Sequence, residues 1–79
     1  MKVKVKFNSD LKDNYAPASS DGVVELILKD CSKINDVFDA LRIDEGEVGF
    51  VLLNENKVQK DDAVSDQDLI QIFSLVAGG

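Results

Sequence analysis

The sequence contains no histidine and a single cysteine, Cys31. A chain with no histidine and only one cysteine cannot assemble a Ser-His-Asp or Cys-His catalytic group, a zinc cluster or an internal disulfide. Long apolar runs are also missing: none approaches the roughly 20 residues that a helix needs to cross a bilayer. Segment 1–7 alternates charged and apolar side chains, unlike a signal peptide. We therefore expect a cytoplasmic protein that does not insert into a membrane.

Basic side chains are scarce. Nine Lys and Arg residues stand against fifteen Asp and Glu residues, which gives a formal net charge of −6. Nucleic-acid binding needs a basic face that displaces counterions from phosphates, and an acidic surface is repelled by anionic lipid. The composition therefore argues against nucleic-acid and membrane partners. The surplus of acid fits either plain solubility or encounter with a basic protein partner.

Hydrophobic periodicity predicts the elements of one small domain, residues 1–79. Alternation and β-forming residues predict four strands, at 1–7, 23–28, 48–54 and 69–76, and Val58 marks a short fifth. Ser32 is the expected N-cap of a helix. The helix has apolar residues at i, i+3, i+4 and i+7, namely Ile34, Val37, Phe38 and Leu41. Four or five strands and one helix make a two-layer α+β domain.

The predicted core leaves one face of the sheet to be explained. We expect a joint core of Val5, Phe7, Ile34, Phe38, Leu41, Val51 and Ile70. Strands 48–54 and 69–76 are apolar on both faces, whereas one helix covers a single face. Either the long polar segment 8–22 folds over the second face, with Tyr15 at the core edge, or that face is an exposed docking site.

Three other features allow weaker interpretations. Cys31 is either a reactive thiol or a buried residue at the start of the helix, and we expect burial. The paired carboxylates at Asp61-Asp62 and Asp66-Gln67-Asp68 suit a Ca²⁺ or Mg²⁺ ion, but no EF-hand spacing surrounds them, so we expect solvated turns. Asn56 is a candidate for positive φ in the turn after the third strand.

The sequence ends in Gly78-Gly79, directly after the last predicted strand. Glycine has no side chain to block a narrow channel, and its backbone adopts conformations that are closed to other residues. We expect residues 77–79 to form a flexible tail without secondary structure. An extended tail reaches on the order of 13 Å beyond Val76. The Gly79 carboxylate would then be the one uncommon reactive group of the chain.

Several of these features together resemble the ThiS/MoaD family of sulfur-carrier proteins. They are the β-first order, Asn54 at the end of the third strand, the Asp66-Gln67-Asp68 run and the terminus 72–79. The resemblance implies the ubiquitin-like β-grasp fold, a mixed sheet with the last strand in the centre, parallel to the first. Many members have Asn-Gly where Asn54-Glu55 stands and Asp-Gly-Asp where Asp66-Gln67-Asp68 stands. Both the molybdopterin and the thiamin branches of the family stay open.

The resemblance implies a substrate of other enzymes rather than an enzyme. An adenylating partner would activate the Gly79 carboxylate with ATP and Mg²⁺, and a persulfide donor would convert it to a thiocarboxylate. The sulfur would pass to a precursor on a molybdopterin synthase large subunit or a thiazole synthase. Gly79 would carry the sulfur, Gly78 would ease threading, and Phe73, Leu75 and Phe50 would dock the partner. The chain itself would bind no cofactor or metal.

Two other functions fit the same residues. A ubiquitin-like modifier would be joined through Gly79 to lysines of other proteins, and that reaction also begins with adenylation. A non-catalytic interaction domain would make no use of its glycines, and its three aromatic and aliphatic docking candidates would be ordinary packing residues.

Overall fold

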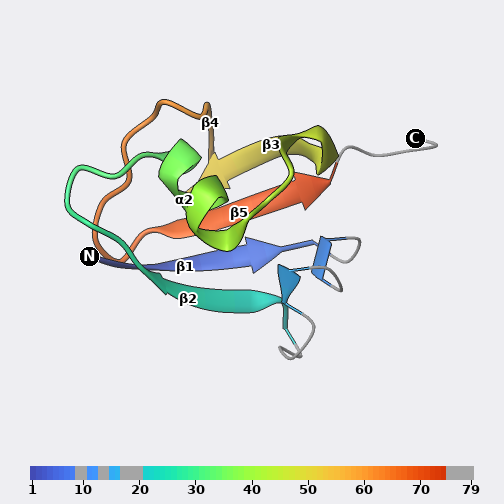
Figure 1. The fold of residues 1–79 in the computed structure, drawn as a ribbon, viewed down its shortest axis with the longest axis horizontal. Helices are drawn as coiled ribbons and strands as arrows, with labels where there is room; N and C mark the ends of the chain where they lie inside the picture. The colour runs from blue at the N-terminus through green and yellow to red at the C-terminus, as the bar shows by residue number, and fades with distance from the viewer. Residues whose placement is uncertain (9–10, 13–14, 17–20, 75–79) are drawn as a thin grey trace.

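The computed structural model describes residues 1–8, 11–12, 15–16 and 21–74 (Figure 1). Its strands form one mixed sheet in the order β2-β1-β5-β3-β4. The elements in chain order are β1 (Lys2–Phe7), β2 (Val23–Ile27), α2 (Ile34–Leu41), the 3₁₀ turn η1 (Glu45–Glu47), β3 (Val48–Leu53), β4 (Asn56–Val58) and β5 (Leu69–Ser74). Within the described ranges, no helix is long and apolar enough to span a membrane.

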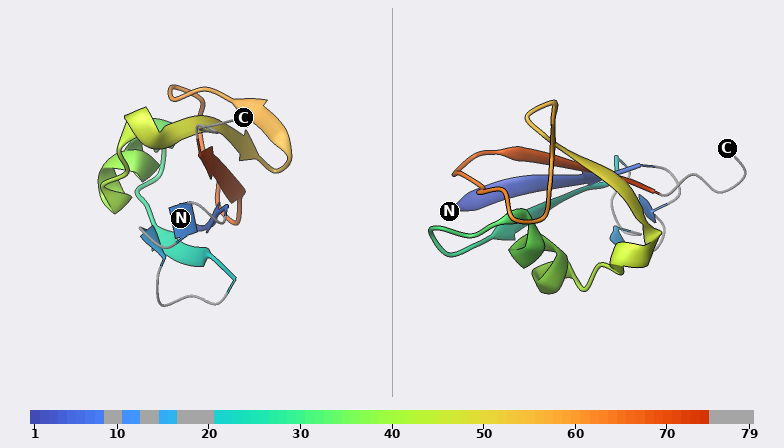
Figure 2. Two further views of the ribbon diagram at one scale, coloured as in Figure 1. Left: turned by 90° about the vertical axis from the view of Figure 1, so that its right-hand side faces the viewer. Right: turned by 90° about the horizontal axis from the view of Figure 1, so that it is seen from above.

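The centre of the sheet is β5, which runs parallel to β1 and antiparallel to β3. α2 lies across one face of the sheet, and the opposite face carries no helix among the described residues (Figure 2). The two-layer α+β architecture, the fifth strand and the central position of the last strand are confirmed.

The core lies between α2 and the sheet. Strict alternation on β1 buries every second side chain, and β5 does the same with Ile70 and Ile72, which are fully buried. Six of the seven predicted core residues are buried. Leu41 is the exception: it is only partly buried because α2 ends there, and Arg42 turns the chain away with a left-handed φ of 55°. Each fully buried aliphatic side chain contributes about 1.5–3 kcal/mol.

The start of α2 differs from the prediction that Ser32 is the N-cap. Lys33 is the N-cap, and its backbone N–H donates to the Asp36 carboxylate at 2.8 Å. The Ser32 hydroxyl donates backwards to the carbonyl of Lys29 at 2.7 Å. A serine hydroxyl bonds neighbouring backbone in several ways, and here it stabilises the turn before the helix. An acidic side chain in the first turn stabilises the helix instead.

The described part of segment 8–22 packs on the core side of the sheet. Leu11 and Ala16 are buried, and the Tyr15 ring stacks on Phe7 with centroids 5.4 Å apart. The Tyr15 hydroxyl accepts from the Asp44 N–H at 3.0 Å and donates to Glu47 at 3.1 Å. Tyr15 thus lies at the core edge, as predicted. The segment closes one end of the core, so the interpretation in which it covers the second face does not hold for these residues.

Two turns contain residues in left-handed backbone conformations. The β3–β4 turn has positive φ at Asn54 (49°) and Glu55 (71°), whereas Asn56 is the first residue of β4, so the expectation for Asn56 is wrong. Two consecutive positive φ values are the requirement of a tight two-residue hairpin turn. Gly22 has a φ of 74°, and a Cβ atom there would lie 2.8 Å from the Phe7 carbonyl, so this turn requires glycine.

The strand ends also differ slightly from the predicted ones. The second strand ends at Ile27 and the third at Leu53, one residue earlier than expected in each case. β5 is described as far as Ser74, and residues 75–76 of the predicted last strand lie outside the described residues.

Candidate functional site

Ser74, the last described residue of β5, is held by contacts with β3 and with Asn8. Ser74 is buried and lies opposite Val48 on β3. The Asn8 side-chain amide donates to the Ser74 hydroxyl at 3.3 Å, and the Asn8 N–H donates to the Ile72 carbonyl at 3.2 Å. Anything that follows Ser74 therefore starts from a held position at the rim of the sheet. The predicted tail residues Gly78 and Gly79, and the docking candidate Leu75, lie outside the described residues.

The other two docking candidates form a stacked pair on the sheet face opposite α2, which we call the open face. Phe50 on β3 and Phe73 on β5 are register partners, with ring centroids 4.6 Å apart and planes 8° apart. Phe50 is 39% exposed, and Phe73 is partly exposed. Aromatic surface in this position is available to a partner protein, and an exposed apolar patch is typical of a docking site.

A β-bulge places Val48 and Phe50 on opposite faces of the sheet. Val48 pairs with Ser74 and Phe50 with Phe73, so one extra residue, Gly49, stands between the two pairs. Residues two apart on a regular strand share a face, but a bulge breaks this rule. Val48 consequently packs against the core while Phe50 lies on the open face.

Lysines border the open face, and our sequence analysis did not place them in the site. The strand register puts Lys6 opposite Gln71 and Lys57 opposite Leu52, in the row next to the aromatic pair. Lys2 and Lys4 lie further along β1 on the same face. The alternation of lysines over 1–7 was visible in the sequence, but their distance from Phe50 and Phe73 depends on pairings between distant strands.

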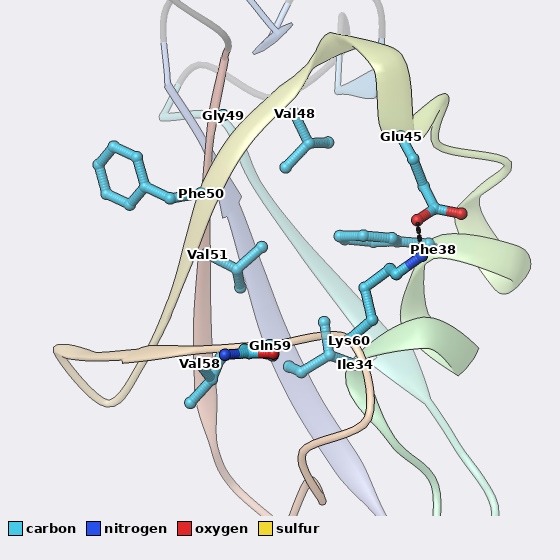
Figure 3. A pocket seen from close by; sticks show the side chains of 10 residues that line it. All are labelled: Ile34, Phe38, Glu45, Val48, Gly49, Phe50, Val51, Val58, Gln59 and Lys60. Carbon is cyan, nitrogen blue, oxygen red and sulfur yellow. Dashed lines mark ion pairs between the residues drawn. The ribbon is translucent and has the colours of Figure 1, made fainter.

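A hollow of about 250 Å³ lies on the helix side of the sheet, between α2 and β3 (Figure 3). Its floor is apolar and includes Phe38 and Val51, while Phe50 points away from it. The Lys60 side chain lies along the hollow, and its ammonium group pairs with the Glu45 carboxylate at 2.7 Å. This contact raises the pKa of Lys60. The two charged groups of the lining, Lys60 and Glu45, are paired with each other, and the remaining lining residues are apolar apart from Gln59.

The weaker chemical candidates have structural roles or none. Cys31 is exposed, contrary to the expected burial, and has a left-handed φ of 68° in the turn before α2. Asp68 accepts from the Ser65 N–H and from the Asn54 amide, and Asp66 accepts from the Lys2 N–H. These carboxylates hold turns together. Among the described residues, no three His, Cys, Asp or Glu side chains gather in a way that suits a metal ion.

A central last strand parallel to the first, with one helix packed on the sheet, defines the ubiquitin-like β-grasp class. The model of the ThiS family matches residues 5–79, and the chain belongs to this family. No curated protein matches it.

Solved structures share the fold at low sequence identity. The putative molybdopterin converting factor subunit 1 of Pyrococcus furiosus is 21% identical, with a TM-score of 0.76 over 96% of this chain and 99% of that one. The small archaeal modifier protein 1 of Haloferax volcanii is 21% identical, with a TM-score of 0.74 over 95% and 98% of the two chains. A protein–protein complex of subunits 1 and 2 of the molybdopterin-converting factor of Helicobacter pylori contains a chain that is 19% identical, with a TM-score of 0.65 and full coverage of both chains.

Proposed function

We propose that the chain is a sulfur carrier whose Gly79 carboxylate is activated by an adenylating enzyme and converted to a thiocarboxylate. The observation that carries the proposal is the match of the ThiS family model, which extends to Gly79, five residues beyond the end of β5. Ser74 is buried and bonded to Asn8, so the last described residue of β5 is held in place. A terminus without side chains suits a narrow active site on another protein.

The proposed chemistry needs three steps: activation of the carboxylate, attack of sulfur on its carbon atom and release of the thiocarboxylate. A carboxylate resists nucleophiles because its charge is delocalised and oxide is a poor leaving group. An oxygen of the Gly79 carboxylate attacks the α-phosphorus of ATP, held with Mg²⁺ by the partner, and pyrophosphate leaves. The terminal sulfur of a persulfide then attacks the acyl carbon, and AMP leaves. A second thiol of the donor system attacks the acyl disulfide, which releases the thiocarboxylate and leaves a disulfide behind.

We further propose that the thiocarboxylate gives its sulfur to a precursor on a second enzyme, a molybdopterin synthase large subunit or a thiazole synthase. The H. pylori complex of subunits 1 and 2 supports the first of these, because its small chain shares the fold of this protein. In this scheme the chain is a carrier and not an enzyme, it holds no cofactor, and it works in the cytoplasm where ATP is available.

The open face is the proposed docking surface for these partners. Phe50 and Phe73 form its aromatic pair, and Leu75 follows Ser74 directly in the sequence. Gly78 provides the backbone freedom that threading requires. A partner that covers the aromatic pair and accepts the chain beyond Ser74 contacts a continuous strip of the molecule.

The direct test is mass spectrometry of the protein purified from its native source. A carrier shows an intact mass that ends at Gly79 with one oxygen replaced by sulfur. In a reconstituted reaction, deletion of Gly79 abolishes acyl-adenylate formation. Gly78→Ala keeps the Gly79 carboxylate and therefore retains part of the acyl-adenylate formation. A mature chain that continues past Gly79, or a Gly79 deletion that still sustains cofactor synthesis in cells, contradicts the proposal.

A second candidate function is protein modification through Gly79. The specific observation in its favour is the similarity of the fold to that of the H. volcanii small archaeal modifier protein 1. Both fates begin with the same adenylation, so the activation assay does not separate them. Mass spectrometry of digested cellular proteins separates the two functions. Lysine peptides branched with Gly-Gly identify a modifier, and a thiocarboxylate without such peptides identifies a carrier.

A further inference from the structure

The charges of this acidic protein are sorted between its two sides. The helix side carries exposed acids on α2, at and before η1 and in the loop after β4, at Asp36, Asp39, Asp44, Glu45, Glu47, Asp61 and Asp62, against the exposed cations Lys33, Arg42 and Lys60. The open face carries four lysines and, within the strands, a single acid, Glu25. The net charge of −6 is therefore the sum of two surfaces with unlike charge.

Among the described residues, one of the four open-face lysines has an acidic partner. Lys2 pairs with Glu25 at 3.1 Å. Lys4, Lys6 and Lys57 take part in no ion pair within the part of the chain that the structure describes. A cation without a partner in the free protein contributes its full charge to an encounter.

Two of these lysines border the aromatic pair closely. The row Lys6–Gln71–Leu52–Lys57 lies two residues along the strands from the row of Phe73 and Phe50, a separation of about 7 Å. A lysine side chain is long enough to cover that distance. The apolar centre of the face is thus edged by a positive charge on either side.

We propose that this face binds a protein surface in which carboxylates surround an apolar centre, and that the adenylating enzyme provides it. The inference rests on the proposed function. An acidic protein as a whole would favour a basic partner, but charges are screened over about 8–10 Å in physiological salt. At contact distance the local lysines dominate, and the acidic helix side turns away from the partner. Complementary charge of this kind sets orientation and association rate more than final affinity.

The test is calorimetric titration of the full chain with the purified adenylating enzyme of the source organism, without ATP, at 50 mM and 300 mM NaCl. The variant Lys6→Glu/Lys57→Glu reverses both border charges. Its matched control, Lys29→Glu/Lys33→Glu, changes the net charge equally on exposed residues outside the open face. At low salt we expect the first variant to raise Kd at least tenfold and the control less than threefold. The difference shrinks at high salt. Circular dichroism verifies that both variants fold.

The neutral variant Lys6→Gln/Lys57→Gln should give an intermediate Kd. Equal weakening by the two charge-reversed variants would show that only net charge matters and would overturn the inference. So would wild-type affinity of Lys6→Glu/Lys57→Glu, or no binding by the wild type. Salt-sensitive self-association that the same pair abolishes would assign the face to a second copy instead.

A parallel assay of pyrophosphate release from ATP, the product of acyl-adenylate formation, keeps the two proposals apart. Binding that depends on the border lysines but gives no acyl-adenylate refutes the carrier function and leaves the docking face standing. Acyl-adenylate formation with an unchanged KM in Lys6→Glu/Lys57→Glu refutes the docking face and leaves the carrier function standing.

Discussion

The Asn54 side-chain amide donates to the Asp68 carboxylate at 2.8 Å across 14 residues of sequence. Its carbonyl oxygen accepts from the Leu69 N–H at 2.9 Å, and its backbone N–H donates to the Leu69 carbonyl at 2.8 Å. One asparagine thus connects the end of β3 to the start of β5. Two of the features that suggested the family, Asn54 and the Asp66-to-Asp68 run, are therefore joined by these hydrogen bonds.

Replacement of Asn54 should therefore destabilise the fold measurably. Asn54→Ala removes two side-chain hydrogen bonds, one of them to a carboxylate, and places alanine at a left-handed φ of 49°. We expect a loss of about 2–4 kcal/mol in urea unfolding. Asn56→Ala is the control, because its single side-chain bond is long, at 3.3 Å, and it should cost less than about 0.5 kcal/mol.

Glycine at the next position should stabilise the protein. Glu55 has a φ of 71°, where a Cβ atom costs roughly 1–2 kcal/mol relative to glycine. Glycine also loses more entropy on folding, so the net gain of Glu55→Gly should be about 0.5–1 kcal/mol. Lys57→Gly, in β4, should destabilise instead. Thermal unfolding measures both, and a lower Tm for Glu55→Gly would show that the turn is not strained.

Acid should weaken the loop before β5. The Lys2 N–H bond, with help from the Gln67 amide, holds the pKa of Asp66 below its ordinary value. A lowered folded-state pKa means stability that is complete above the unfolded-state pKa, near 4, and is lost as pH falls through the folded-state pKa. Urea midpoints at pH 6 and pH 3 should differ less in Asp66→Asn than in the wild type. An equal difference would assign the acid sensitivity to other carboxyl groups.

Tyr15 offers a separate test of how segment 8–22 is held. The Asp44 N–H bond lowers the pKa of Tyr15, but burial and the contact with the Glu47 carboxylate outweigh it and raise the pKa above the ordinary value. Ionisation of the phenol should therefore destabilise the fold above about pH 10. Tyr15→Phe keeps the ring on Phe7 and removes both hydrogen bonds. We expect it to lower the free energy of unfolding by about 1–2 kcal/mol and to remove this part of the alkaline sensitivity.

Loss of the aromatic pair should weaken docking more than folding. Phe50→Ala removes a half-exposed ring and its stack on Phe73. We expect a cost in stability of about 1 kcal/mol and a loss of affinity for the adenylating enzyme above about tenfold. Ile27→Ala is the control, since Ile27 is 71% exposed at the far edge of the same face, on β2. Equal loss of affinity in the two variants would remove the pair from its proposed role.

Much of the fold could be predicted because β1, β5 and α2 follow simple periods. Alternation over Lys2–Phe7 and the i, i+3, i+4, i+7 stripe of α2 each fix one buried face. The failures lie where the backbone leaves these periods. The bulge at Gly49 places Val48 on the core face, opposite to the face of Phe50, and Cys31, at a left-handed φ of 68°, is exposed rather than buried.

The site was predictable only in part for a related reason. Phe50 and Phe73 could be nominated as apolar residues on the second face of their strands, but their stacking depends on the register of β3 against β5, which pairs them directly. The position of Lys6 beside that pair follows from the pairing of β1 with β5, which joins residues about 65 positions apart. Local sequence patterns carry no information on such distant pairings.

The central position of β5 also affects when the protein can fold. Synthesis proceeds from the amino terminus, and β5 is the last described strand to leave the ribosome. Until it does, β1 and β3 have no strand between them, and the pairing of Lys4 with Leu69 closes nearly the whole chain. A prematurely terminated product therefore lacks the middle of its own sheet and is exposed to proteases. The domain therefore becomes stable only after the chain has been translated through Ser74, and a shorter product does not form it.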